Sequence, residues 1–122
     1  MNTPEHDEQV ALFRWAALNE NRLPELKNMF AVQNGGQRHK AVAAKLKAEG
    51  VKAGVPDIFL AFPKIYHSGA FFAGLFIEMK AGKNRTTQSQ KEWIVGLKNA
   101  GYMVAVCYGW EQAVQEIERY LG

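Results

Sequence analysis

The sequence contains one cysteine, four prolines and no long apolar run among its 122 residues. Because Cys107 stands alone, neither an intrachain disulfide framework nor a cysteine-based zinc site can form. The longest uncharged stretch, residues 65–77, includes a histidine, a serine and glycines, and is shorter than the roughly 20 apolar residues that span a bilayer. The first residues are acidic, so we expect no secretory leader. We therefore expect one intracellular domain over residues 1–122, without repeats or a membrane anchor.

The net charge of +3 conceals an uneven distribution along the chain. Residues 38–98 contain eleven basic and four acidic side chains, a net charge of +7, whereas residues 1–37 and 99–122 each carry a net charge of −2. A basic middle segment suggests an anionic partner, and nucleic acid is the commonest one. The same lysines could equally solvate two exposed helix faces. Charge alone leaves both interpretations open.

Apolar periodicity predicts four helices and four strands in the order αβαββαβα. Helices are expected at 4–20, around Val42 to a C-cap at Gly50, from Thr87 to near Gly101, and at 110–121; strands are expected at 29–32, 57–61, the second half of 70–80, and 102–108. Thr87 followed by Gln90 fits a capping box. The strand that ends at Lys80 should return antiparallel to 57–61, which gives an α/β fold with a mixed sheet.

Charged side chains interrupt two of the apolar strands. Asp57 opens one strand, and Glu78 and Lys80 close another. Since alternate residues of a strand share a face, Glu78 and Lys80 should project together, and antiparallel pairing would bring Asp57 and Glu78 to one edge. Two carboxylates with a backbone carbonyl and water suit Mg²⁺ or Mn²⁺, which could activate water against a phosphate beside the lysine. The alternative without a catalytic role is that Glu78 and Lys80 form an ion pair at the surface and that Asp57 caps a turn.

Four short blocks follow one another along the chain at compatible spacings. They are Asn34-Gly35-Gly36 with Arg38, Gly54-Val55-Pro56-Asp57, Glu78-Met79-Lys80, and Arg85-Thr86-Thr87 with Gln90. Together they resemble the VRR-NUC family, a branch of the PD-(D/E)XK nuclease superfamily, over nearly the whole chain. The resemblance implies a restriction-endonuclease-like core and metal-dependent hydrolysis of DNA.

The resemblance also implies roles for individual residues. Asp57 and Glu78 look like metal-binding carboxylates, and the main-chain carbonyl of Met79 would be a further metal contact. Lys80 looks like the catalytic lysine. Gln90 stands where the family has a helix glutamine near the active site, so we count it with the catalytic residues.

The remaining site residues are expected from the first helix and from basic segments. The superfamily often supplies a glutamate from its first helix, and we assign Glu8 to the metal site, with Glu5 one turn earlier as the alternative. Lys83 and Arg85, in the loop after the catalytic strand, are expected to contact DNA phosphates, as is Arg38. A solvent-exposed helix residue without a function would look the same in the sequence, so Arg38 could be either a phosphate contact or a solvated side chain.

The expected function is a Mg²⁺- or Mn²⁺-dependent DNA endonuclease, with no organic cofactor. No base-reading module accompanies the core, so selectivity should come from DNA shape or branching, as in a Holliday-junction resolvase. A domain with one active site needs a second copy to cut two strands, and the apolar residues of 66–76 (Phe71, Phe72, Leu75, Phe76) are expected to help form a homodimer.

Two alternatives belong to other classes of protein. One is a non-catalytic DNA-binding or scaffold module, against which the Asp57, Glu78 and Lys80 set argues. The other is a nuclease subunit that is inert without a helicase or recognition partner. By analogy with compact members of the family that the sequence resembles, we expect the protein to act in the cytoplasm of a bacterial or phage-infected cell.

Overall fold

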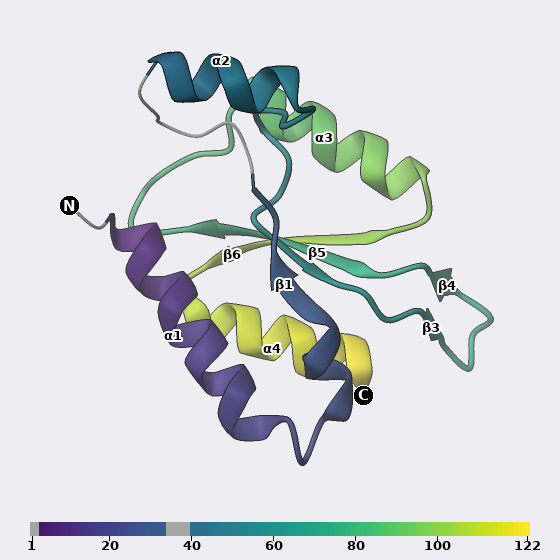
Figure 1. The fold of residues 1–122 in the computed structure, drawn as a ribbon. Helices are drawn as coiled ribbons and strands as arrows, with labels where there is room; N and C mark the ends of the chain where they lie inside the picture. Colours follow the sequence, from purple (N-terminus) through teal and green to yellow (C-terminus); the bar gives the residue numbers. More distant parts are fainter. Residues whose placement is uncertain (1–2, 34–39) are drawn as a thin grey trace.

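The computed structural model describes residues 3–33 and 40–122. The predicted block that contains Asn34, Gly35, Gly36 and Arg38 lies outside the described residues. The helices are α1 (Pro4–Asn19), η1 (Pro24–Asn28, a 3₁₀ turn), α2 (Lys40–Ala48), α3 (Gln88–Asn99) and α4 (Trp110–Leu121), and the strands are β1 (Met29–Ala31), β2 (Ile58–Leu60), β3 (Lys64–Ile65), β4 (Phe71–Phe72), β5 (Leu75–Lys80) and β6 (Met103–Tyr108) (Figure 1). Among the described residues, no helix combines the length and apolar character that crossing a membrane requires.

A mixed sheet with the strand order β1-β2-β5-β6 forms the centre of the protein. The pairs β1–β2 and β2–β5 are antiparallel, and β5–β6 is parallel. The predicted αβαββαβα order is therefore confirmed for the four long helices and the four strands of this sheet, as is the antiparallel return of the strand ending at Lys80. Because Ile58 pairs with Ile77, the register brings Asp57 level with Glu78.

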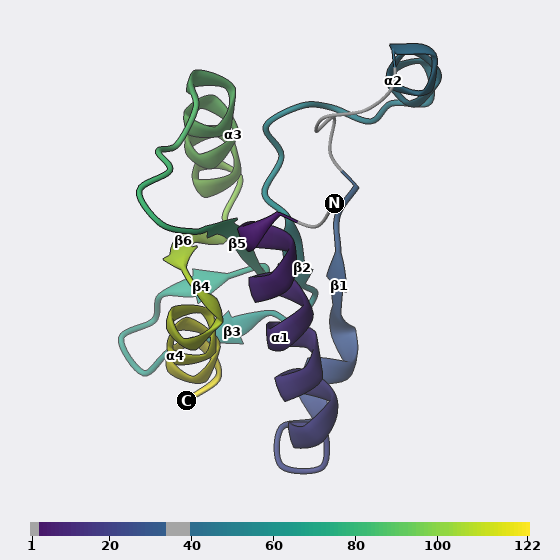
Figure 2. The same cartoon turned by 90° about the vertical axis from the view of Figure 1, so that its left-hand side faces the viewer.

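The helices lie on both faces of the sheet, with α1 and α4 on one side and α2 and α3 on the other (Figures 1 and 2). The core lies between the sheet and the α1–α4 layer, where Leu12, Ile77 and Ile117 are fully buried. Burial of each such side chain contributes about 1.5–3 kcal/mol. Strand alternation sends Ile77 and Met79 into this core and turns Glu78 and Lys80 to the opposite face.

A short hairpin, β3–β4, lies between β2 and β5 and was not among the predicted strands. Strands of two residues leave no periodicity in the sequence, so the pattern could not show them. Two of the apolar residues expected at a dimer interface lie instead in β5, where Leu75 is buried in the core and the ring of Phe76 stacks on Phe59 with centroids 4.3 Å apart. The large apolar side chains left at the surface here are Phe71, 55% exposed, and Ile65, 70% exposed.

Two glycines set the path of the chain around α2. Gly50 has φ +95° and ends α2, with the amide of Val51 donating to the carbonyl of Leu46 at 2.9 Å, as the predicted C-cap requires. Gly54 has φ +91°, and a Cβ at this position would lie 2.8 Å from the carbonyl carbon of Ser89 in α3. The loop that leads into β2 thus packs directly on the first turn of α3. The helix α2 itself has no buried residue.

Candidate active site

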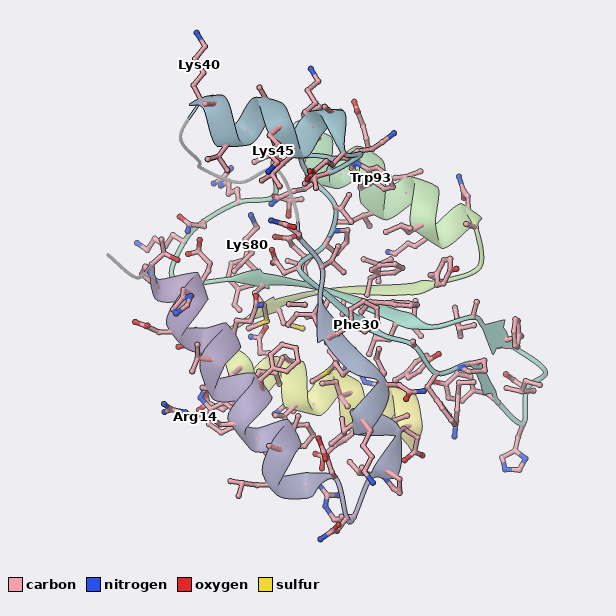
Figure 3. The ribbon with its side chains drawn as sticks, in the orientation of Figure 1. Arg14, Phe30, Lys40, Lys45, Lys80 and Trp93 are labelled. Atoms are coloured by element: carbon pink, nitrogen blue, oxygen red, sulfur yellow. The ribbon has the colours of Figure 1, made fainter. Side chains whose placement is uncertain are left out.

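The four residues predicted to be catalytic meet on the face of the sheet that α3 covers. Asp57 directly precedes β2, and Glu78 and Lys80 lie in β5. Gln90 lies in the first turn of α3, at the third position of the helix. Figure 3 shows Lys80 extending from β5 toward the side of α2 and α3. Glu78 and Lys80 are 3% and 7% exposed, and they are the buried charged residues of the described chain.

The side chain of Gln90 connects the charged residues of β5. Its Oε1 accepts a hydrogen bond from Nζ of Lys80 at 2.8 Å, and its Nε2 donates to Oε2 of Glu78 at 3.0 Å. The same Oε1 accepts the main-chain N–H of Thr87 at 2.9 Å, and the Thr87 hydroxyl accepts the N–H of Gln90 at 3.2 Å. The predicted capping box is therefore present, and its glutamine serves the helix end and the buried charges together.

Asp57 joins the start of β2 to the end of β5. Its Oδ2 accepts the main-chain N–H of Met79 at 2.7 Å. Burial first, and then the negative charge of Asp57, raise the pKa of Glu78 to about 8, against a smaller lowering by Lys80. Burial together with a charged neighbour is a frequent origin of strongly shifted pKa values at functional sites.

One oxygen of this carboxylate pair lacks a hydrogen-bond partner in the described part of the chain. Within the described residues, Oε1 of Glu78 is buried and makes no hydrogen bond. A buried polar atom of this kind is costly unless something binds it. A cation is the natural partner for an oxygen in a pair of carboxylates.

The residues present fit a Mg²⁺ or Mn²⁺ ion that keeps much of its water. In the described chain, no three His, Cys, Asp or Glu side chains gather closely enough to hold a metal by themselves. Mg²⁺ is commonly bound by one or two carboxylates, with water and substrate phosphate oxygens in the other positions. Asp57 and Glu78, with the main-chain carbonyl of Met79, are a donor set of this size and chemistry.

The two N-terminal glutamates have different surroundings. Oε1 of Glu8, the residue assigned to the metal site from the sequence, accepts the main-chain N–H of Trp110 at 2.7 Å and so caps α4, where the N-cap Gly109 has no side chain to do so. The negative charge of Glu5 raises the pKa of Glu78, and Oε2 of Glu5 accepts a hydrogen bond from Nδ2 of Asn84 at 2.9 Å. Glu8 thus caps α4, whereas the charge of Glu5 acts on Glu78, and the assignment of Glu8 to the metal site stays a prediction.

The basic residues expected to contact DNA lie in two segments. Lys83 and Arg85 are exposed in the loop that follows β5, and Arg38 lies outside the described residues. The exposed helix α2 adds Lys40 and Lys45, which are five positions apart and therefore about 140° apart around the helix. In the view of Figure 3, Lys40 extends away from the rest of the protein, whereas Lys45 lies on the side of α2 that faces α3 and the sheet.

Sequence reasoning missed two residues that contact the site. Asn84 lies between Lys83 and Arg85 in the loop predicted to contact phosphates, and Tyr108 ends the strand predicted at 102–108, but neither was predicted to contact the site. The hydroxyl of Tyr108 donates to the main-chain carbonyl of Asn84 at 2.8 Å. The register that pairs Tyr108 with Lys80 brings it here, and that register was not available from the sequence. Cys107 is fully buried, and burial raises the pKa of its thiol to about 12, which rules it out as a nucleophile.

A mixed sheet with helices on both faces, and Asp57 beside the buried Glu78 and Lys80 on the α3 face, defines a nuclease core of the restriction-endonuclease type. Residues 3–111 match the family described as the VRR-NUC domain, and the chain belongs to that family. A solved structure described as "VRR_NUC domain protein" is 28% identical with a TM-score of 0.77, and the match covers 99% of this chain and 90% of that chain. No curated protein matches the sequence. Family membership makes the chain a nuclease-type, DNA-binding domain.

Proposed function

We propose that this VRR-NUC domain is a Mg²⁺- or Mn²⁺-dependent DNA endonuclease that hydrolyses phosphodiester bonds. One observation carries the proposal. Oε1 of Glu78 is buried beside Asp57 and finds no hydrogen-bond partner within the described part of the chain. A divalent cation held by Asp57, Glu78 and the main-chain carbonyl of Met79 would give that oxygen a partner and remove the cost of its burial.

The residues around the carboxylate pair have separate roles in hydrolysis. A bound metal ion would polarise the phosphate and lower the pKa of a water molecule. As the water oxygen bonds to phosphorus and the bond to the leaving oxygen breaks, negative charge builds on the phosphate oxygens. The Lys80 ammonium orients the water and offsets that charge. Gln90 holds the ammonium in place through the 2.8 Å hydrogen bond to its Oε1.

DNA is the proposed substrate because basic side chains lie on both sides of the carboxylate pair along the chain. Lys83 and Arg85 follow Lys80 directly, and α2 adds Lys45 on the side facing the sheet. Contacts from such residues to phosphates position a duplex without reading its bases. We therefore propose selectivity for DNA shape, with branched DNA such as a four-way junction as the preferred substrate.

A homodimer is proposed because one domain carries one active site. The hairpin β3–β4 presents Phe71 and Ile65 to solvent, 55% and 70% exposed, and extends beyond the sheet in Figure 1. A symmetric pair of such hairpins would bury these side chains and supply two sites for two strands. Light scattering at micromolar concentration tests this part: a dimer that Phe71→Asp converts to monomer supports it, and a monomeric wild-type protein contradicts it.

The nuclease proposal is tested by incubating the purified protein with supercoiled, linear and four-way-junction DNA in Mg²⁺, Mn²⁺ or EDTA. We expect metal-dependent cleavage that is lost in Asp57→Ala and Lys80→Ala. The control variants Asp7→Ala and Lys98→Ala remove the same charges at exposed positions and should cleave normally. If no metal-dependent cleavage of any substrate occurs, the proposal is wrong. Cleavage that survives both site substitutions would place the active site elsewhere.

The alternatives predict different outcomes of the same assay. A non-catalytic DNA-binding or scaffold module would bind the junction and leave it intact with every metal. A subunit that depends on a helicase or recognition partner would cut only when that partner is added. The buried Glu78–Gln90–Lys80 connection argues against the scaffold, because binding DNA requires no buried charges.

A further inference from the structure

A row of aromatic rings crosses the sheet on the face that carries the candidate active site. Phe30 of β1 pairs with Phe59 of β2, and Phe59 pairs with Phe76 of β5. The rings of Phe59 and Phe76 are stacked with centroids 4.3 Å apart, and the ring of Phe30 stands at 85° to that of Phe59 with centroids 5.8 Å apart. The ring of Tyr102, just before β6, packs edge-on against Phe59 and Phe76. These four residues are called the aromatic row below.

The aromatic row lies close to the carboxylate pair. Phe76, Glu78 and Lys80 are alternate residues of β5 and therefore share one face, and Phe59 stands two residues after Asp57. Two residues of a strand span about 7 Å. This length is twice the rise per nucleotide of one DNA strand, about 3.4 Å. A phosphate held at the carboxylate pair would therefore bring the next nucleotides of its strand to the row.

The helices on this face leave the aromatic row partly open to solvent. Within the described chain, neither α2 nor α3 contains a buried residue. In Figure 2, α3 lies over β5 and β6 and not over β1. Phe30 is accordingly 49% exposed, and the other three rings of the row are half-buried, whereas Ile58 and Ile77 on the opposite face are fully buried. Apolar surface left open beside a site typically marks contact with a ligand or partner.

The charges on this face identify the kind of ligand. Lys80 lies in β5 next to the row, and Lys45 lies on the side of α2 that faces the sheet (Figure 3). Basic side chains that follow a phosphate backbone, together with aromatic rings on which bases stack, are the combination with which proteins bind unpaired nucleic acid. A base inside a duplex is stacked on its neighbours and has to leave its pair before it can lie on a protein ring.

We infer that the aromatic row is a stacking platform for an unpaired base next to the phosphate at the carboxylate pair. Phe30 supplies the exposed ring, and Phe59, packed against Phe76, supports it. A Cβ at Gly74 would lie 2.6 Å from the Phe59 ring, so the glycine leaves the space that this ring occupies. The inference rests on the proposed nuclease function and deepens it, because the platform adds affinity only where a base has left its pair, as at a branch point.

Binding of DNA in EDTA tests the platform without cleavage. The probes are a fully paired duplex, the same duplex with a short thymidine bulge, and the same duplex with a bulge of abasic nucleotides, which keeps the backbone and lacks the bases. We expect the wild-type protein to bind the thymidine bulge at least about fivefold more tightly than the abasic bulge, the lower end of the range for stacking of one base on an aromatic side chain. Phe30→Ala should bind the two bulges equally and the paired duplex like the wild type.

Three further variants separate the ring from the fold. Phe30→Tyr keeps the ring and should keep the preference for the thymidine bulge. Phe30→Leu keeps apolar bulk at the sheet edge and should lose most of the preference, which tests the ring even if alanine weakens the fold. Leu18→Ala removes an apolar side chain that is 85% exposed on α1 and should bind all probes like the wild type.

The outcomes distinguish this inference from the proposed function on which it rests. A wild-type protein without preference between the bulges, or an equal preference in wild type, Phe30→Ala and Phe30→Leu, would overturn the platform and leave the nuclease proposal standing. Loss of the preference in Phe30→Ala and Phe30→Leu, with retention in Phe30→Tyr, supports the platform. If that pattern occurs in a protein that cleaves no DNA with any metal, the nuclease proposal is wrong and the base-binding surface remains.

Discussion

Nζ of Lys80 and Oε2 of Glu78 lie 3.9 Å apart, and the side-chain amide of Gln90 bridges them with hydrogen bonds of 2.8 and 3.0 Å. The lysine therefore has a neutral acceptor as its closest partner, and the carboxylate has a neutral donor. This arrangement holds two buried ionisable side chains at a fixed spacing and leaves Oε1 of Glu78 without a hydrogen bond in the described part of the chain. It also fixes the orientation of the Gln90 amide, because only one arrangement of its oxygen and nitrogen satisfies both neighbours.

Two substitutions separate the role of Gln90 in the site from its role in the helix. Thr87→Ala removes the N-cap hydroxyl of α3 and should cost about 1 kcal/mol of stability with cleavage nearly unchanged. Gln90→Ala removes the bridge as well, and the resulting misplacement of Lys80 should lower kcat by about 10²-fold. Thermal unfolding and cleavage kinetics check the pair. Equal loss of activity in both variants would mean that α3 stability, rather than the bridge, matters.

The stability of the metal-free protein should fall as pH rises between about pH 4.5 and pH 8. Burial, with the charge of Asp57, raises the pKa of Glu78 to about 8 from 4.5, so within this window the folded protein keeps a proton that the unfolded chain has released. Through this group, the free energy of unfolding should fall by at most about 1.4 kcal/mol per pH unit.

Glu78→Gln tests this directly, because glutamine has a similar shape and does not ionise. The variant should lose less stability than the wild type as the pH rises and should be the more stable protein near pH 8, as measured by urea unfolding in EDTA. Glu92→Gln, at an exposed position of α3, is the control and should follow the wild type. Parallel curves for wild type and Glu78→Gln would contradict the prediction.

Mg²⁺ or Mn²⁺ should stabilise the folded protein. A ligand at a concentration 100 times its Kd adds about 2.7 kcal/mol, which corresponds to a rise in Tm on the order of 10 °C for a protein of this size. The metal should not raise the Tm of the Asp57→Ala variant, whereas it should raise the Tm of Asp7→Ala as it does that of the wild type. Differential scanning calorimetry with and without metal provides the measurement. A metal-induced rise that persists in Asp57→Ala would show that the ion binds elsewhere.

Two lysines of α2 offer a matched test of DNA contact. Lys45 lies on the side of α2 facing the sheet and Lys40 on the outer side (Figure 3). Alanine favours helix at least as well as lysine, so both substitutions should leave α2 intact. Lys45→Ala should reduce the dependence of log Kd on log salt by about 0.9, the value for one lost phosphate contact, and Lys40→Ala should not. Binding of duplex DNA in EDTA at several salt concentrations measures both.

Features with strong local signals were predictable from the sequence. Charged residues in an otherwise apolar strand marked β5, and the antiparallel pairing with β2 placed Asp57 level with Glu78. The spacing of Thr87 and Gln90 predicted the capping box, which the structure confirms. Strand alternation placed Glu78 and Lys80 on one face, and both contact the same glutamine.

Contacts between distant segments could not be predicted in the same way. Glu5 and Glu8 lie on neighbouring turns of α1, and nothing local distinguishes them. Glu8 meets the N-terminus of α4 because Gly109 offers no capping side chain there, and Glu5 meets Asn84, 79 positions away. The hairpin β3–β4 is too short for periodicity to reveal. Leu75 begins β5, and its burial depends on packing against distant elements, which the sequence pattern does not show.

The close approach of Gly54 to Ser89 predicts the result of a saturation mutagenesis experiment at the glycines. Gly50 and Gly69 also have positive φ angles, but a Cβ there would have nothing within 4 Å, so asparagine should be tolerated at both. At position 54 a Cβ would lie 2.8 Å from the backbone of α3, one residue before Gln90. Every side chain larger than hydrogen would push α3 and its glutamine away from Lys80. In a library selected for activity, position 54 should accept glycine alone.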